Sequence, residues 1–467
     1  MKKLLYSVFT VWFMMVCLLP GLGMLALGPS PAAGNETVTA PPSILRTDGS
    51  PNVELLSDAA GWFAKRFAFR RELITVDSFL KANLLHTSSQ SQVSLGREGW
   101  LYYTETLDDF TGADVLAPRQ AYCIARTLRL AQDYAESQGA EFLFTIAPNK
   151  AGIYPQNLPG SLQTAQAVEA YSSPAVAAIE RQGVHYADLF GPLKAQDEVL
   201  YFATDSHWTN KGAALAHDVL LDALGLPAES AFLKAGDYQA THRGDLYEMI
   251  YPASPRLDLE YEFAQPLGFS YARPIRDVDD LRIKTVSGSE NGSLLMFRDS
   301  FGNALHSLMA ESFSSAIFSR AMPYRMELTG QGEVQYVVTE IVERNLPRLA
   351  EAPFLMPAAQ IEDWQALWGE DFFVEDNHSP ETATIVVEQV GGYRKVAAET
   401  AAGCDTDSPV YLVRIAKDGN LSAWETFPVY TEGGTACAGY LPDDIVEGST
   451  IRMVFRSDGR WKWTAKN

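Results

Sequence analysis

Ser300 is the residue whose sequence setting points most directly to nucleophilic chemistry. It lies in "MFRDSFGN", residues 296–303, where the apolar run "LLMF" gives way to the amphipathic run "FGNALHSLM". This pattern predicts a strand, a turn and a helix, and the start of a helix offers unpaired backbone N–H groups that stabilise an oxyanion. Serine also caps helices at this position. The stretch alone therefore fits either a nucleophile or a helix cap.

His207 is the histidine best placed to activate such a serine, which is a weak nucleophile without a base. It stands in "YFATDSHWTNKG", directly before a periodic helical segment, with Asp205 two residues earlier. In an extended segment both side chains lie on one side, so the carboxylate can fix the imidazole tautomer and favour the imidazolium. The alternative is a helix-capping loop with Thr209 or Asn210 as the cap. His242, in "THRGDL", is a reserve candidate for the base.

Other kinds of site have weaker support in the sequence. Asp205 and His207 have the side-chain types of a metal site, but no HExxH pattern or second clustered pair accompanies them, so no metal is predicted. There is no Walker A motif or dinucleotide fingerprint, and no cofactor is predicted. The formal net charge of −21 argues against a nucleic-acid partner, because phosphate binding needs clustered Lys and Arg.

The N-terminal segment predicts export. Lys2 and Lys3 precede an uncharged run from Leu4 to Leu27, which exceeds the ~7–15 residues of a secretory h-region and reaches the ~20 residues that span a bilayer. Residues 1–28 are therefore predicted to be an uncleaved signal anchor of a single-pass protein in the cell membrane, with the catalytic domain extracytoplasmic. The alternative is a cleaved signal peptide, for which "SPAAG" supplies small residues, and a secreted protein.

The rest of the chain divides into three parts. Residues 29–55 are rich in Pro, Ala, Ser, Thr and Gly and predict a linker. Residues 56–355 predict the catalytic domain, in which strands alternate with helices from about residue 91, as in an α/β domain with a mainly parallel sheet. Residues 370–467 consist of short strand-like runs and predict a small all-β domain.

Two pairs of residues in the last part have alternative roles. Trp461 and Trp463 alternate as in a strand, and packing in a core is favoured over stacking on sugar rings. Cys404 and Cys437 are candidates for a disulfide, because an exported protein folds in a compartment that permits one.

The combined motifs resemble a known family. "TDSHWT" followed by "FRDSFGN", with "GREGWLYY" upstream, is similar to the alginate O-acetyltransferases of the AlgJ and AlgX type and to the related DHHW proteins. The resemblance covers roughly residues 55 to 350 and includes "PNKAGIYP", "GDLYEMI" and "YVVTEIVERNL". It implies an SGNH-hydrolase-like three-layer domain in which Ser300 is the nucleophile, His207 the base and Asp205 its orienting carboxylate. Ser206 departs from the double-His pattern that names the DHHW proteins.

The resemblance also implies a set of substrate-binding residues. Arg298 flanks the nucleophile, where structural support is an equal alternative, and the others lie in matching segments. The full set is Arg298, Tyr102, Lys150, Tyr154 and Trp208.

The function that this resemblance implies is transfer of an acetyl group, through an acyl-serine, to hydroxyls of an exported polysaccharide. The implied partners are the polysaccharide acceptor, a membrane-bound O-acyltransferase that supplies the acetyl group, and the membrane itself. Water and a sugar hydroxyl compete for the same acyl-serine, so a glycan acetyl-esterase is one alternative. A non-catalytic glycan-binding or scaffold protein of the envelope is the other.

Overall fold

A seven-stranded sheet organises the α/β part of the chain in the computed structural model, which describes residues 2–32, 40–162, 171–228, 234–331, 333–370, 372–373, 378–443 and 449–465. Its strands, in spatial order, are β4 (Tyr186–Ala187), β3 (Glu141–Ala147), β11 (Tyr336–Val342), β9 (Ser293–Phe297), β10 (Ser315–Ser319), β8 (Arg282–Val286) and β7 (Ser270–Tyr271). The first five pair in parallel, whereas β10–β8 and β8–β7 are antiparallel. The expected mainly parallel sheet is therefore mixed. The loop between β7 and β8 contains no helix in the structure, and without such a crossover the two strands pair antiparallel.

Helices cover both faces of this sheet. Met296 and Phe297 are adjacent in β9 and belong to hydrophobic cores on opposite faces, as the alternation of side chains along a strand requires. The core around Met296 includes side chains of α9 (Asn210–Ala223) and α11 (Gly302–Ser312), and the core around Phe297 includes those of α5 (Pro118–Ser137) and α7 (Ser172–Gln182). The result is a three-layer α/β/α arrangement.

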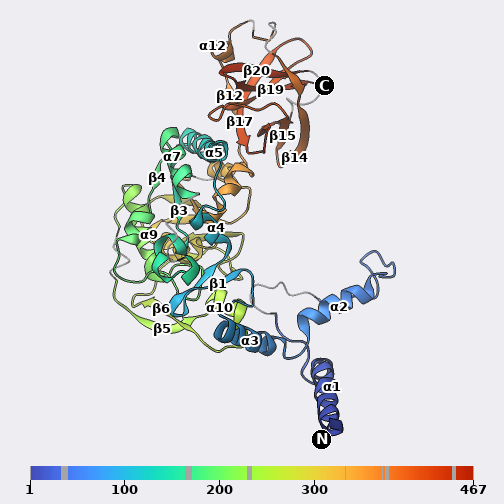
Figure 1. The fold of residues 1–467 in the computed structure, drawn as a ribbon. Coiled ribbons are helices and arrows are strands. Elements are labelled where there is room, and N and C mark those ends of the chain that lie inside the picture. The colour runs from blue at the N-terminus through green and yellow to red at the C-terminus, as the bar shows by residue number, and fades with distance from the viewer. Residues whose placement is uncertain are drawn as a thin grey trace.

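Shorter elements surround the edge of the sheet at which the strands end. They are α3 (Arg70–Leu80), β1 (Val93–Leu95), β2 (Leu101–Tyr103), α4 (Glu105–Thr111), α6 (Lys150–Ile153), α8 (Phe190–Lys194), β5 (Gly236–His242), α10 (Asp245–Ile250), β6 (Asp258–Phe263) and the 3₁₀ segment η7 (Glu343–Ala350). Helix α2 (Leu55–Arg66) has no buried residue and lies apart from the sheet (Figure 1). Strands β1 and β2 form one small antiparallel sheet, and β5 and β6 form another.

The C-terminal strands form a separate nine-stranded sheet. It contains β12 (Ala359–Ile361), β13 (His378–Thr382), β14 (Thr384–Val390), β15 (Tyr393–Thr400), β16 (Val410–Ile415), β17 (Leu421–Val429), β18 (Thr435–Pro442), β19 (Thr450–Ser457) and β20 (Arg460–Ala465), with α12 (Trp364–Trp368) beside it. Trp461 packs 5.7 Å from the ring of Tyr411 and Trp463 packs 5.8 Å from that of Phe373, so both belong to an aromatic core, as favoured from the sequence.

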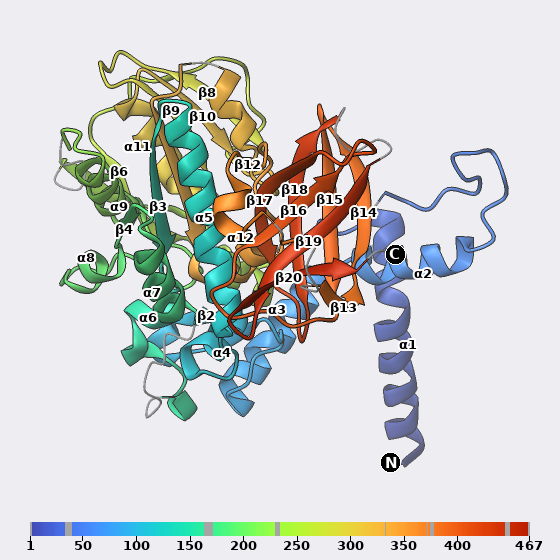
Figure 2. The same cartoon turned by 90° about the horizontal axis from the view of Figure 1, so that it is seen from above.

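Helix α5 contacts both sheets and lies between the central sheet and the C-terminal strands (Figure 2). Arg126 of α5 forms an ion pair with Glu425 of β17 at 2.6 Å, and Arg119 donates to the carbonyl of Ser408 at 2.6 Å. Figure 1 shows the C-terminal strands at one end of the molecule and the N-terminal helix at the other. The predicted domain boundaries stay predictions.

The N-terminal helix α1 (Lys2–Leu27) contains a segment, Tyr6–Leu27, of 22 residues with a mean hydropathy of 2.1, long and apolar enough to cross a membrane. A signal peptide has the same character, so the uncleaved anchor stays a prediction.

The disulfide expected between Cys404 and Cys437 is absent, since both cysteines are free in the structure. Cys437 lies within β18, and its thiol is hydrogen-bonded to Thr426. Cys404 lies in the loop after β15. Burial raises the pKa of the Cys123 thiol to about 12, and the charge of Cys404 adds to this rise. The sequence shows that both residues are in the C-terminal part, but only the packing shows which neighbour each thiol has.

Candidate active site

The turn that carries Ser300 follows the buried central strand β9. Asp299 shapes this turn by accepting hydrogen bonds at both carboxylate oxygens. Its Oδ1 accepts from the backbone N–H of Phe301 at 3.0 Å, and its Oδ2 accepts from that of Val342 at 2.8 Å. The turn places Ser300 at the end of β9 and at the start of α11, as the strand-to-helix pattern predicted.

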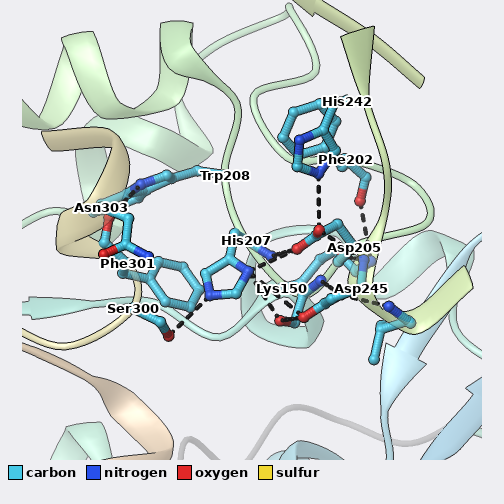
Figure 3. A network of polar contacts seen from close by, with 12 residues as sticks. Lys150, Phe202, Asp205, His207, Trp208, His242, Asp245, Ser300, Phe301 and Asn303 are labelled. Atoms are coloured by element: carbon cyan, nitrogen blue, oxygen red, sulfur yellow. Dashed lines mark hydrogen bonds and ion pairs between the residues drawn. The ribbon is translucent and has the colours of Figure 1, made fainter. Parts of the chain in front are cut away.

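His207 and Asp205 lie next to Ser300 in a continuous chain of hydrogen bonds (Figure 3). His207 Nε2 is 2.9 Å from Ser300 Oγ, and His207 Nδ1 is 2.7 Å from Asp205 Oδ1. Burial alone would raise the pKa of Asp205, but hydrogen bonds from His207 and His242 hold this pKa well below its ordinary value. The carboxylate is therefore ionised and able to stabilise an imidazolium at His207.

Lys150 lies beneath the loop that carries Asp205. Its ammonium donates to the backbone carbonyls of Phe202 at 3.1 Å, Ala203 at 3.2 Å and Asp205 at 2.6 Å. The residue is only 4% exposed, and burial lowers the pKa of Lys150 to about 7. Its three donated hydrogen bonds hold the loop in one conformation.

Three aromatic residues expected to contact substrate also face the interior. Tyr102 donates to the carbonyl of Tyr154 at 2.7 Å, and the Tyr154 hydroxyl accepts from the backbone N–H of Leu200 at 2.7 Å. Trp208 donates from Nε1 to the carbonyl of Phe301 at 3.0 Å and so joins the histidine loop to the serine turn. All three rings are buried and their polar atoms are engaged inward.

Arg298 is fully buried, and its guanidinium donates to the side chain of Asn303 and to the carbonyl of Val278. Burial lowers the pKa of Arg298 to about 10. The backbone of Gly302 approaches so closely that a Cβ there would lie 2.6 Å from the Arg298 Cβ. Arg298 thus supports the turn, which is the structural alternative stated for it.

The five residues expected to bind substrate do not line the cleft that contains Ser300, and their role in binding stays a prediction. Arg298, Tyr102, Lys150, Tyr154 and Trp208 are all buried and form a frame beneath the serine and histidine loops. Motif similarity placed them near the site, but only long-range packing decides whether a nearby side chain faces inward or outward.

The cleft above this frame has a volume of about 650 Å³. Besides Ser300 and His207, its lining includes Tyr103, Asp245, Asp279, Asn303, Arg320, Arg344 and Arg348. The Arg344 guanidinium lies 5.7 Å from the ring centre of Tyr103 and 5.4 Å from that of Phe301. Within the described ranges, no carboxylate forms an ion pair with Arg344 or Arg348.

Two residues in the site were not among the predicted triad. Asp245 donates its backbone N–H to Asp205 Oδ2 at 2.9 Å and accepts the hydroxyl of Ser206 at 2.6 Å. His242, considered only as a reserve base, contacts Asp205 Oδ2 at 2.8 Å rather than Ser300. Asp245 lies in "GDLYEMI", a segment that the resemblance included, so a signal for it was present.

Asp205, His207 and Asp245 present oxygen and nitrogen atoms within 4.8 Å of one another, as a metal site would. Both oxygens of Asp205, however, already accept N–H groups, from His207 at one oxygen and from His242 and Asp245 at the other. These hydrogen bonds hold Asp205 as an ionised carboxylate directed at His207.

Comparison with known proteins identifies a family to which part of the chain is similar. Residues 93–278 match a family described as "SGNH hydrolase-like domain, acetyltransferase AlgX". This match includes Asp205 and His207 and ends before Ser300. The resemblance to an AlgJ/AlgX-like family is therefore confirmed.

Among curated proteins, the chain is similar to the probable alginate O-acetylase AlgJ of Pseudomonas syringae pv. tomato, with 27% identity over 178 residues. The match covers 37% of this chain and 44% of the relative. The AlgJ of Pseudomonas putida is 27% identical over 179 residues, with 37% and 45% covered. The chain thus spans less than half the length of these relatives. The solved O-acetyltransferase domain of Pseudomonas putida AlgJ is 20% identical, with 55% of this chain and 92% of that one covered and a TM-score of 0.37.

Proposed function

We propose that this chain is a cell-envelope O-acetyltransferase that moves an acetyl group through Ser300 to hydroxyls of an exported polysaccharide. The observation that carries the proposal is the chain of contacts from Asp205 through His207 to Ser300 at the wall of a cleft. Helix α1 is the membrane anchor, and a membrane-bound O-acyltransferase supplies the acetyl group.

The reaction has two halves. Ser300 Oγ attacks the carbonyl carbon of the acetyl donor while His207 Nε2 takes the serine proton. The tetrahedral oxyanion collapses, the donor's leaving group departs with that proton, and acetyl-Ser300 remains. A sugar hydroxyl then attacks the acetyl carbon, gives its proton to His207, and Ser300 leaves with the proton restored. General base assistance of this kind contributes ~10²–10⁴-fold in rate.

Two parts of the structure support the charge changes in this cycle. Asp205 is ionised and faces His207 Nδ1, so it stabilises the imidazolium formed in each half. Helix α11 begins two residues after Ser300, and the partial positive charge at the N-terminus of a helix stabilises an oxyanion.

Two arginines offer a local site for a carboxylate of the acceptor, within a cleft that is also lined by Glu105, Asp245, Asp279 and Glu351. The chain as a whole has a formal net charge of −21 and would repel a polyanion. Arg344 and Arg348 line the cleft beside Ser300 and have no carboxylate partner among the described residues. Guanidinium groups pair well with carboxylates, so this pair of arginines provides a local site for an acidic sugar.

The test uses the full chain in detergent, mixed with p-nitrophenyl acetate as an activated acetyl ester. Peptide mass spectrometry is then used to look for acetyl on Ser300 in the wild type, Ser300→Ala and His207→Ala. We expect acetyl on Ser300 in the wild type and much less in His207→Ala. A folded wild type that shows no acetyl on Ser300 would refute the proposal.

Added oligosaccharides separate transfer from hydrolysis. Acetylated oligosaccharides, formed at the expense of free acetate, indicate a transferase. Release of acetate alone, with both neutral and acidic oligosaccharides present, indicates the esterase instead.

A further inference from the structure

His242 is a second imidazole in the site, and the mechanism described above gives it no role. It is the last residue of β5, and its ring stacks on that of Phe202, with the ring centres 3.8 Å apart and the planes at 10°. Its Nε2 lies 2.8 Å from Asp205 Oδ2 (Figure 3). Its side chain is 29% exposed.

The two oxygens of Asp205 have separate partners. Oδ1 accepts from the backbone N–H of His207 at 2.9 Å and lies 2.7 Å from His207 Nδ1. Oδ2 accepts from the backbone N–H of Asp245 at 2.9 Å and from His242. With donors on both oxygens, the carboxylate cannot rotate without losing hydrogen bonds, so Oδ1 stays directed at His207.

The segment that carries His242 is pressed against the loop that carries Asp205. The backbone of Gly244 approaches Thr204 so closely that a Cβ there would lie 2.3 Å from the Thr204 hydroxyl oxygen and 2.6 Å from its carbonyl oxygen. The contact between His242 and Asp205 is therefore built into the packing of two loops and does not depend on one flexible side chain.

We propose that His242 is a positioning residue that fixes the Asp205 carboxylate and thereby tunes its action on His207. This inference rests on the proposed acyl-transfer function. It assigns the imidazole an action through Asp205 and no contact with the reacting atoms.

The charged groups around His242 determine its protonation. Burial lowers the pKa of His242, but the hydrogen bond and charge of Asp205 raise it, with further contributions from Glu260 and Asp258 on β6, and the pKa is raised overall. Asp245 is the other carboxylate beside Asp205, and Lys150 lies on the far side of the same loop.

A protonated His242 competes with His207 for the negative charge of Asp205. Asp205 then gives less stabilisation to the imidazolium that forms at His207, because the same carboxylate also contacts the charged His242. Replacing His242 by a neutral donor should therefore strengthen the stabilisation that Asp205 gives to this imidazolium. The acid limb of kcat/KM should move to higher pH, because His207 acts as a base only when it is neutral.

Two substitutions separate the donor from the ring. His242→Gln keeps an N–H donor without a charge, and His242→Phe keeps the stacking on Phe202 without a donor. The full chain in detergent is assayed for hydrolysis of p-nitrophenyl acetate from about pH 5 to about pH 9, the window in which histidine titrates. Thermal melting shows whether each variant folds. His185→Phe, a histidine outside the site that contacts the Phe142 carbonyl, is the matched control.

For His242→Phe we expect kcat to fall about tenfold with little change in KM, since a hydrogen bond to a charged group is lost. For His242→Gln we expect most of kcat to remain and the acid limb to move to higher pH. Wild-type kcat in folded His242→Phe, or an unmoved acid limb in His242→Gln, would overturn the inference. If His242→Phe does not fold, the acid limb of His242→Gln decides alone. Activity that survives in Ser300→Ala would refute the proposed function instead.

Discussion

Two serine–histidine–aspartate contacts lie at opposite ends of helix α11. In the first set, Ser300 lies just before the helix and contacts His207, which in turn contacts Asp205. Ser312 is the last residue of the same helix, and its Oγ lies 2.7 Å from His217 Nε2, while His217 Nδ1 lies 3.0 Å from Asp218 Oδ1. By distances alone the second set resembles the first.

The electrostatic surroundings distinguish the two sets. The N-terminus of a helix carries a partial positive charge, which stabilises an oxyanion, and the C-terminus carries a partial negative charge, which repels one. The carbonyl of Ser312 accepts from Ser289 Oγ and from Asn291 Nδ2, both at 2.8 Å, and His217 is 3% exposed. We therefore interpret the Ser312 set as a link between α9 and α11. Triad distances alone do not make a nucleophile.

The largest expected difference between the two sets comes from replacing each serine by alanine in turn. Ser300→Ala should lower acetyl transfer by about 10³-fold or more, because no acyl-enzyme forms. Ser312→Ala should leave the rate within about twofold, because the hydroxyl only links α11 to His217 of α9. Steady-state kinetics with p-nitrophenyl acetate measures both, and thermal melting checks that both variants fold. Equal losses would show that the helix end does not decide which serine reacts.

The next largest difference comes from removing the carboxylate charge of Asp205 or of Asp218. Asp205→Asn should lower kcat roughly 10²-fold or more, because the amide can hold the wrong tautomer of His207 and no longer stabilises its imidazolium. Asp218→Asn should leave kcat unchanged. Measuring kcat for both variants tests this contrast, and a large loss in Asp218→Asn would assign catalysis to the second set.

Lys150, buried beneath the loop that carries Asp205, predicts how the free energy of unfolding depends on pH. Since the pKa of Lys150 is lowered to about 7 from 10.5, the unfolded chain binds more protons than the folded one between these values. Raising the pH through this window therefore favours the folded state. The free energy of unfolding of the wild type, relative to Lys150→Met, should increase from about pH 7.5 to about pH 9.5. Urea denaturation at both pH values measures it, and an unchanged or smaller difference would contradict the lowered pKa.

The smallest expected effect is on KM for the oligosaccharide that binds in the cleft beside Ser300. Arg344→Ala should raise KM for a carboxylated oligosaccharide about two- to fivefold, the size expected for a partly exposed ion pair. Added salt should weaken binding to the wild type more than to the variant. A neutral oligosaccharide of equal length is the control, and an equal rise in its KM would show that the arginine charge does not select the acceptor.

The sequence was most informative where the signal was local. The apolar run before Ser300 and the periodic run after it predicted the strand, turn and helix, because strands and helices impose their own spacing of apolar residues. The pair Asp205 and His207 was predicted in the same way, since two residues apart in an extended segment face one side.

Contacts between distant segments came only from the tertiary structure. His242 and Asp205 are 37 residues apart, and no pattern in either segment indicates that they meet. Lys150, Tyr102 and Trp208 lie in segments that the resemblance marked correctly, yet they are buried supports rather than groups that line the cleft.

The sequence by itself therefore determined which residue types are available for acyl transfer and the local elements that carry them. The tertiary structure decided which side chains meet, which face the cleft, and which end of α11 each serine occupies. The physical reason is that burial, hydrogen bonding at Asp205 and the direction of a helix dipole all depend on how separate segments pack together.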